Sequence, residues 1–558
     1  MTLDATPDFR SLALAKSQAK LAAIPDEWKI PDEKMPPDEQ KDVTSFPSSS
    51  GILTDQELEI TQTPAETIVQ RLIKGECKSL DVTRAFCKRA AIAHQLTNCL
   101  SEIMFQDALK AAKEFDDYFS ANGKPFGPLA GLPISIKDNF NVKGYDSTLG
   151  FVAWINDPQD EDSTLVTLLK SQGAVIYCKT TTPTAMMIAE TVSNANGRTL
   201  NPRDRTMTCG GSSGGEGALI AMGGSPLGMG TDIGGSIRIP AAFNAIWGLK
   251  PSLGRFPTHK ARSGLAGQEA VHSINGPMSQ DFSSLELFAR TVVGTQPWNV
   301  DPKCVPIPWS PVSPSSLPDT GLVFAVIKNN GSVAPTPPVL RALEEACRAL
   351  REKGHEIIEW EPTGEFQEAD NLLEAFFGAE GGEGIYKLME AGGEHEVWVP
   401  GLALGKSGKG FTVGQTWANQ ARRTGWGGRM LEKMNGIKGQ SGRVVDAIIS
   451  PVAPDVVTPH DSYHYVGYTG AWNLLDAPGV TFPVPDFKVE TDKDGKDESY
   501  SPMNERDEKV WKEYDVEKLA GLPVCLQLVG RRLQEEKALA LAKRVHEILE
   551  ARGKVAAP

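Results

Sequence analysis

The stretch Gly210–Ala241 reads GGSSGGEGALIAMGGSPLGMGTDIGGSIRIPA, and the rest of the chain is interpreted around it. It holds Ser212 and Ser213 in one glycine-dense loop and Ser236 in a second. The short apolar segment Ala218–Met222 between the loops predicts a buried helical turn or two. The two loops are therefore expected to fold back on one another and to bring their serines together.

Backbone N–H groups beside a serine are the groups that acyl transfer needs. Gly234 and Gly235 let the chain turn sharply and bring bare N–H groups close to a bound group. A serine hydroxyl can then attack a carbonyl carbon while the N–H groups stabilise the oxyanion, but it requires a nearby base. Histidine is the usual base, yet no pattern selects one of the eight histidines (His94, His259, His272, His355, His395, His460, His464 and His546).

Lys137 is a different candidate for the base. It lies in the run Gly131–Asn139, GLPISIKDN, where apolar positions alternate as in a half-buried strand. Partial burial lowers the pKa of a lysine and favours the neutral amine that a base must be. The alternative is a surface lysine at a strand end that pairs with Asp138.

These residues and spacings resemble the amidase signature hydrolases, and among them the fungal acetamidases, with the fatty acid amide hydrolases as relatives. Ser212, Ser236 and Lys137 fall on the cis-serine, the nucleophile and the base of that family. Ser236 follows Ser212 by 24 residues and Lys137 by 99. The matched pattern also includes Asp232, Arg238 and Pro240. Glu216 after the GGSSGG loop favours the acetamidase and fatty acid amide hydrolase branch.

The resemblance implies a role for each matched residue. Ser236 attacks the carbonyl, and a cis Gly211–Ser212 peptide places Ser212 as a proton relay to the neutral amine of Lys137. Met186 falls on a position whose backbone carbonyl faces the leaving group, although its side chain could equally belong to the core. Ser213, Asp232 and Arg238 are interpreted as structural support, the last two as an ion pair. The oxyanion hole would consist of the backbone N–H groups of Ile233, Gly234, Gly235 and Ser236.

Two other motifs compete for the same loop. Residues 211–215 match G-x-S-x-G, the nucleophile elbow of α/β-hydrolases, which would make Ser213 the nucleophile with a histidine base. That motif should directly follow a strand, whereas residues 201–205, NPRDR, are polar and turn-like. A phosphate cradle would need G-x-x-x-x-G-K-[ST], and no lysine follows these glycines.

The predicted fold is α/β: an amidase signature fold with a large mixed central β-sheet sandwiched between α-helices. Strands predicted at 130–137 and 174–179 alternate with helices at 164–172 and after 181. Further strands are expected at 321–328, 447–450 and 523–529, with helices at 338–353 and 535–551. The charged insert 488–514 is expected to be a solvated loop.

The predicted organisation is one large domain behind an N-terminal arm. Residues 1–60 are expected to form a helix, at 9–28, and an extended strap at 31–50; two helices follow at 61–90. Residues 61–558 form a single amidase domain. Its signature core covers about 130–295, and a variable, largely helical pocket region covers about 360–445.

Composition excludes several classes of protein. The 558 residues are 40% hydrophobic and 23% charged with a net charge of −14, typical of a soluble globular protein without a nucleic-acid footprint. Eight scattered cysteines, Cys209 among them, form no metal-spaced pair and indicate a reducing, cytoplasmic compartment. Charges through the first 30 residues leave no room for a signal peptide or transmembrane segment. The resemblance implies no cofactor or metal and is compatible with a homodimer.

The predicted function is hydrolysis of small-molecule carboxamides, most simply short aliphatic amides, to a carboxylate and ammonia or an amine. The same three residues could serve an ester, carbamate or longer-chain acyl amide hydrolase. Two further alternatives are a catalytically silent binding protein on the same fold and the glutaminase subunit of a larger amidotransferase, which would require partner chains.

Overall fold

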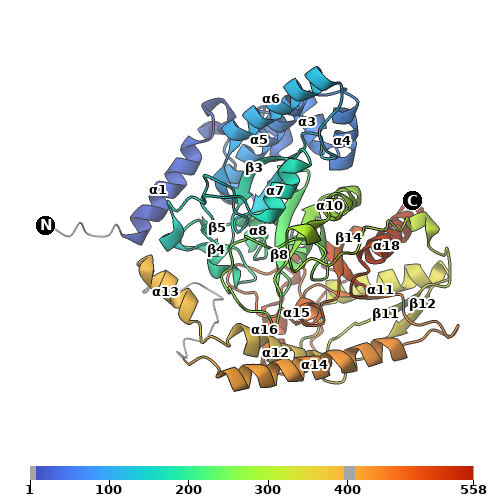
Figure 1. Ribbon diagram of the computed structural model, residues 1–558. Helices are drawn as coiled ribbons and strands as arrows, with labels where there is room; N and C mark the ends of the chain where they lie inside the picture. Colours follow the sequence, from blue (N-terminus) through green and yellow to red (C-terminus); the bar gives the residue numbers. More distant parts are fainter. Residues whose placement is uncertain (1–7, 395–408, 557–558) are drawn as a thin grey trace.

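An eleven-stranded mixed sheet forms the centre of the computed structural model, which describes residues 8–394 and 409–556 (Figure 1). Its strand order is β1-β3-β2-β8-β10-β9-β14-β15-β13-β11-β12. The pairs β2–β3, β2–β8, β11–β12 and β11–β13 are parallel and the others antiparallel. The strands are β1 (Leu100–Ile103), β2 (Pro133–Lys137), β3 (Val175–Thr180), β8 (Gly228–Asp232), β9 (Trp247–Lys250), β10 (Ile274–Ser279), β11 (Val323–Val326), β12 (Glu356–Glu359), β13 (Ala447–Pro451), β14 (Gly479–Lys488) and β15 (Pro523–Val529).

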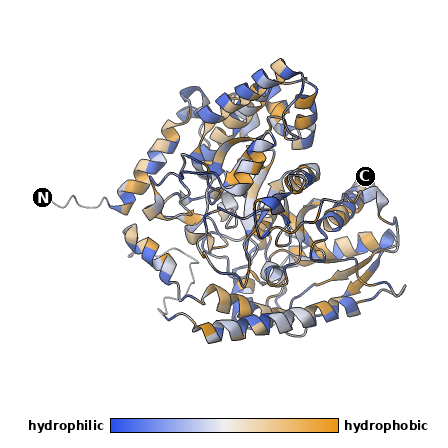
Figure 2. Cartoon of the chain, viewed as in Figure 1, coloured by the Kyte–Doolittle hydropathy of each residue, from blue (hydrophilic) through white to orange (hydrophobic). Residues whose placement is uncertain are grey.

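Helices pack along the whole width of this sheet, so the predicted α/β sandwich is confirmed. Both β2 and β3 are buried throughout, as expected for strands covered on two faces. Figure 2 shows hydrophobic and hydrophilic residues alternating around the outer helices, the pattern of helices that cover a core. The packing helices are α5 (Ser79–Thr97), α6 (Phe105–Asn122), α8 (Gly214–Ala221), α9 (Arg238–Phe243), α10 (Phe282–Gly294), α11 (Pro337–Glu352) and α18 (Glu535–Ala556).

The N-terminal arm lies on the core. Helix α1 (Phe9–Ala22) is shorter than the predicted 9–28, because the chain turns into a 3-10 turn, η1 (Asp26–Trp28). The strap continues through η2 (Asp32–Lys34) and the short helix α2 (Phe46–Ser49). Val43 is fully buried, and its N–H donates to Pro202 O at 2.8 Å. After α3 (Asp55–Gln62), helices α4 (Ala65–Ile73) and α5 confirm the two helices predicted at 61–90.

The insert 488–514 was expected to be a solvated loop, and this holds only for its first part, since residues 489–504 form no helix or strand and are mostly exposed. Residues Glu505–Glu513 form helix α16, whose first N–H groups are capped by the side chain of Asn504. Asp507 is buried and accepts hydrogen bonds from the Ala334 N–H and the Tyr500 hydroxyl. Asp507 therefore has partners inside the fold, which charge density alone does not reveal. The four-residue helix α17 (Val516–Leu519) follows.

A second correction concerns residues 181–187, where a short helix was expected. The chain forms only a 3-10 turn, η4 (Thr184–Met186), and Ala185 and Met186 have φ angles of 58° and 59°. Helix α7 (Thr164–Ser171) lies where a helix was predicted. Two small ribbons, β4–β5 (Val192–Ser193, Gly197–Arg198) and β6–β7 (Leu200–Asn201, Asp204–Thr208), lead into the first serine loop.

The region 360–445 is helical in its described parts, as predicted. It contains α12 (Glu365–Phe377), α13 (Glu383–Ala391) and α14 (Val413–Gly436), while residues 395–408 of this prediction, with His395, lie outside the described residues. Helix α12 packs against α14 and α15 (Gly467–Leu474). In the described part of the chain, no helix is long and apolar enough to cross a membrane.

Candidate active site

Lys137 lies at the end of β2, and its side chain is completely buried. Its Nζ donates hydrogen bonds to Ser212 Oγ and to Thr231 Oγ1, each at 2.7 Å. Burial lowers the pKa of this lysine from 10.5 to about 7, although Asp232 and Asp138 oppose the shift. The bland alternative of a surface lysine paired with Asp138 is therefore wrong. A neutral amine can donate to Thr231 and still accept the Ser212 proton.

The first serine loop lies directly above Lys137 and contains a cis peptide bond between Gly211 and Ser212. Gly211 packs so closely that an added Cβ would come within 2.7 Å of the Glu190 backbone, so no larger residue fits. Ser213 instead turns into the fold, where its Oγ donates to Thr231 O at 3.3 Å and accepts the Thr231 N–H at 3.2 Å. Its contacts are those of a residue that ties the loop to β8.

Ser236 lies in the second loop, between β8 and α9. The exposed fractions of Lys137, Ser212 and Ser236 are 0%, 1% and 9%, so the three side chains run from the interior toward solvent with Ser236 outermost. The Ser213 N–H donates to Ser236 O at 3.1 Å and joins the two loops. Within the described residues the Ser236 hydroxyl has no hydrogen-bond partner, and such catalytic bonds commonly tighten only when substrate binds.

Asp232 and Arg238 fix the backbone of the second serine loop, between β8 and α9, which is called the nucleophile loop here after the role predicted for Ser236. They form the expected buried ion pair at 3.0 Å, and Asp232 also accepts the N–H groups of Gly235 at 2.8 Å and Ile237 at 3.2 Å. Burial disfavours ionisation of Asp232, but the Arg238 guanidinium outweighs burial and lowers its pKa far below 3.8. Because the Gly235 N–H is already engaged, a substrate oxyanion would rely chiefly on the other three amides of the expected hole.

Met186 lies beside this loop. It lines, with Ile233, a cavity of about 250 Å³ whose wall is mostly polar and includes Asn139 and Arg262. A second cavity of about 310 Å³ shares the segment 265–269 with the first, and its far wall contains the rings of Phe376 and Phe377. The nucleophile loop thus borders a polar space, and an apolar one lies next to it.

The structure offers no support for the nucleophile elbow. Ser213 has no histidine among its hydrogen-bond partners, and none of the seven described histidines is bonded to Ser236 either.

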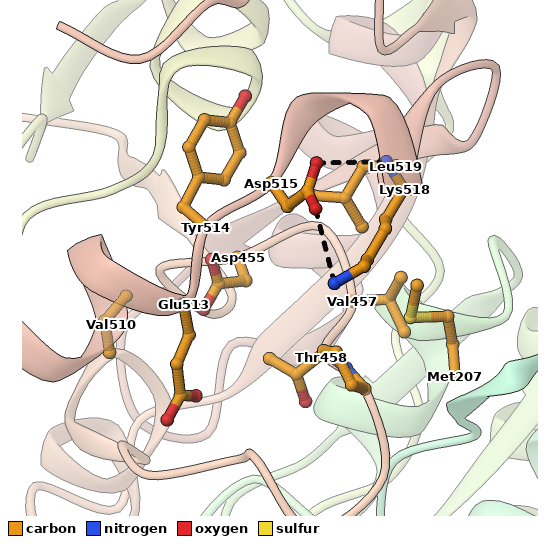
Figure 3. A pocket seen from close by; sticks show the side chains of 11 residues that line it. Met207, Asp455, Val457, Thr458, Val510, Glu513, Tyr514, Asp515, Lys518 and Leu519 are labelled. Carbon is orange, nitrogen blue, oxygen red and sulfur yellow. Dashed lines mark hydrogen bonds and ion pairs between the residues drawn. The ribbon is translucent and has the colours of Figure 1, made fainter.

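Cys209 is fully buried, which raises the pKa of its thiol and makes it a packed residue rather than a nucleophile. The small hollow of Figure 3, near Asp455 and Glu513, has a volume of about 20 Å³, which is room for about one water molecule, and its lining includes none of Lys137, Ser212 and Ser236.

Sequence reasoning missed Thr231, the second acceptor of the Lys137 amine. The sequence places it beside Asp232, but its contact with Lys137 depends on β8 lying next to β2 in the sheet. That neighbour relation joins segments 94 residues apart. Knowledge of the strand order would have been the only usable signal.

Comparisons with known proteins agree with this geometry. The Amidase family model matches residues 81–539. The chain is 41% identical to the acetamidase of Emericella nidulans, covering 96% of this chain and 97% of the relative, and 39% identical to the acetamidase of Aspergillus oryzae, covering 97% and 99%. A solved fatty acid amide hydrolase superposes with a TM-score of 0.90 at 31% identity, covering 98% of this chain and 97% of that one. The chain therefore belongs to the amidase signature family and is an amide hydrolase.

Proposed function

We propose that the protein hydrolyses short aliphatic carboxamides through a Ser236–Ser212–Lys137 relay. The observation that carries the proposal is the fully buried Lys137, held 2.7 Å from Ser212 Oγ in a site that lowers the pKa of its amine to about 7. A buried lysine without a direct carboxylate partner is costly, and such groups concentrate at sites that use the neutral amine.

In the proposed reaction Ser236 Oγ attacks the amide carbonyl carbon and passes its proton to Ser212 Oγ. The Ser212 proton passes in turn to the Lys137 amine, while backbone N–H groups of the nucleophile loop stabilise the oxyanion. Each well-placed donor contributes about 3 kcal/mol to the transition state. The C–N bond then breaks as the proton returns through Ser212 to the leaving nitrogen.

Water completes the cycle on the acyl-enzyme. It attacks the ester carbon of acylated Ser236 and gives up one proton, which passes along the same relay to Ser236 Oγ, and the carboxylic acid that leaves releases its remaining proton to solvent. Every proton taken up by Lys137 is returned within one turnover. The relay therefore needs no further acid or base.

The proposed substrate class rests on the relatives and on the cavities. Both acetamidases align with this chain over nearly their full length. The polar cavity beside Ile233 can hold a primary amide and its leaving ammonia. Turnover of acetamide should exceed that of a matched acetate ester relative to their uncatalysed rates; a preference for the ester would favour the esterase alternative.

The first test is intact-mass spectrometry after treatment with a fluorophosphonate, which phosphonylates activated serines. Wild-type protein and Ser213→Ala should each gain one adduct, and Ser236→Ala should gain none. An adduct that disappears only in Ser213→Ala would favour the nucleophile-elbow alternative, in which Ser213 is the nucleophile. Absence of labelling in all three proteins would favour the silent binding protein.

A further inference from the structure

Glu216 lies in helix α8 and is completely buried among the residues that surround Lys137. Its Oε2 is 2.6 Å from the hydroxyl of Ser135, two residues before Lys137 on β2. Its Oε1 is 3.0 Å from the hydroxyl of Thr180, the β3 residue paired with Lys137 across the sheet. The carboxyl group therefore contacts a neighbour of Lys137 along its own strand and another on the adjacent strand.

Glycine at position 228 makes room for this carboxyl group. Gly228 lies on β8 opposite Ser135, and a Cβ added to it would come within 2.1 Å of Glu216 Oε2 and 2.8 Å of Ser135 Oγ. Even alanine would displace the carboxyl group. Glycine at position 228 therefore leaves the space that the side chain of Glu216 occupies beside β2.

The hydroxyl groups around Glu216 supply too few protons for their contacts. Ser225 Oγ lies 2.9 Å from both Leu227 O and Ser135 Oγ, and the contacts of Glu216 with Ser135 and Thr180 bring the short contacts to four, besides a longer contact of 3.5 Å between Thr180 Oγ1 and Ile136 O. Each hydroxyl donates one proton, so three hydroxyls satisfy only three contacts. A protonated Glu216 that donates to Ser135 supplies the fourth proton, whereas a carboxylate would leave one of these short contacts without a proton of its own.

The other two acids that act on Lys137 differ from Glu216. Asp138 receives three protons for three contacts, from the hydroxyls of Ser101 and Thr148 and from the Leu149 N–H, and needs none of its own. The Nζ of Lys179 lies 3.9 Å from it.

Asp232 is neutralised by Arg238. Glu216 has no ion-pair partner within the described residues, and burial raises its pKa from 4.5 to about 8. Of the three acids, Glu216 alone lacks a cation of its own and retains its proton.

We propose that Glu216 is a positioning residue for the catalytic lysine. As a neutral acid it holds Ser135 and Thr180 on two sides of Lys137 without the negative charge that would keep the amine protonated. The inference rests on the proposed role of Lys137 as the base. It extends that role by explaining how a polar site supports a free amine.

The test compares Glu216→Gln with Asp138→Asn, each replacing an acid by its neutral isostere. The rate of fluorophosphonate labelling is measured from pH 5 to pH 9, and the pH at which the rate is half-maximal reports the Lys137 proton. Glu216→Gln should leave this midpoint within about 0.3 pH unit of wild type. Asp138→Asn should lower it by about 1 unit or more, since it removes a real charge. A fall of that size in Glu216→Gln would overturn the proposal.

Thermal unfolding supplies a readout that does not depend on activity. A glutamate is ionised above about pH 4.5 in the unfolded chain, whereas folded Glu216 keeps its proton to about pH 8, so the wild type loses stability as pH rises through this window. Glutamine cannot titrate. The Tm of Glu216→Gln relative to wild type should therefore rise between pH 5 and pH 8, by about 2 °C or more. A constant difference would overturn the proposal even if labelling failed altogether.

Ser135→Ala keeps Glu216 and serves if the glutamine variant does not fold. Loss of an acceptor for the Glu216 proton favours the ionised form, so the labelling midpoint should move to higher pH. If Glu216 were instead a carboxylate accepting from Ser135, the same change would favour its protonation. The midpoint would then move to lower pH, which contradicts the proposal.

Discussion

The two serine loops and the helical segment α12–α14 both border the nucleophile, but they are held in different ways. From 210 to 241 every residue except Ile233 is buried, and directional hydrogen bonds and one ion pair fix the backbone. The helical segment is held mainly by apolar packing, and Val413 and Trp417 on α14 are 64% and 67% exposed. We therefore expect the chemistry to take place in the tightly held serine loops, and substrate selection to depend on the helical segment, whose exposed face tolerates substitution.

The largest effect on activity is expected at Lys137, which contacts the tightly held first serine loop. Lys137→Ala should lower kcat/KM for acetamide by about 10²–10⁴-fold, the contribution of a general base. The circular dichroism spectrum should remain that of the wild type, because the change removes an amine whose burial itself costs free energy. Retention of the wild-type rate would show that Lys137 is not the base. The serine loops and the helical segment would then no longer differ in their importance for the chemistry.

The ion pair under the nucleophile should matter for stability. Arg238→Ala leaves the carboxylate of Asp232 buried without its cation, which costs about 3–5 kcal/mol in the free energy of unfolding. Urea denaturation would measure it. A matched change at the exposed pair of Lys113 and Asp117, Lys113→Ala, should cost less than about 1 kcal/mol. Equal costs would mean that the loop is not held as described.

The pH dependence follows from the buried amine. Because the pKa of Lys137 is about 7 and the proposed mechanism uses the free amine, the rate should fall about tenfold for each pH unit below 7 and level off above it. Between pH 7 and 10.5, Lys137 is deprotonated in the folded protein but still protonated in the unfolded chain. The free-energy cost of burying Lys137 is therefore largest below pH 7 and falls as the pH rises toward 10.5. Activity that is constant from pH 5 to pH 9 would contradict the assignment.

The same contrast explains what could be predicted from the sequence. Glycine spacing and strand alternation draw attention to Ser212, Ser236 and Lys137, and the family resemblance implies their roles; the structure then places Lys137 Nζ 2.7 Å from Ser212 Oγ. Thr231, which depends on which strands are neighbours, left no such record. The sequence does not predict the buried charges of the insert 488–514, because their partners, such as Arg341 beside Asp494, lie about 150 residues away in the chain.

The pocket region depends even more on contacts between distant segments. Phe377 at the end of α12 would lie 3.8 Å from a Cβ added to Gly234, so its ring covers the nucleophile loop. Its neighbours include Met186 and Leu265 of one apolar cluster, and it also packs against the cluster around α12 and α14. No spacing in the sequence connects position 377 with position 234.

Substitution of Phe377 is the smallest change in rate that we expect and the sharpest probe of the comparison. The ring separates the nucleophile loop from the apolar cavity of about 310 Å³, so Phe377→Ala should open a path for longer acyl chains. The ratio of kcat/KM for hexanamide to that for acetamide should rise about tenfold, within the range that a hydrophobic pocket discriminates per methylene. Trp417→Ala, on the exposed face of α14, should leave the ratio unchanged. If the two variants behave alike, acyl-chain length is not limited by Phe377, and selection lies nearer the rigid loops.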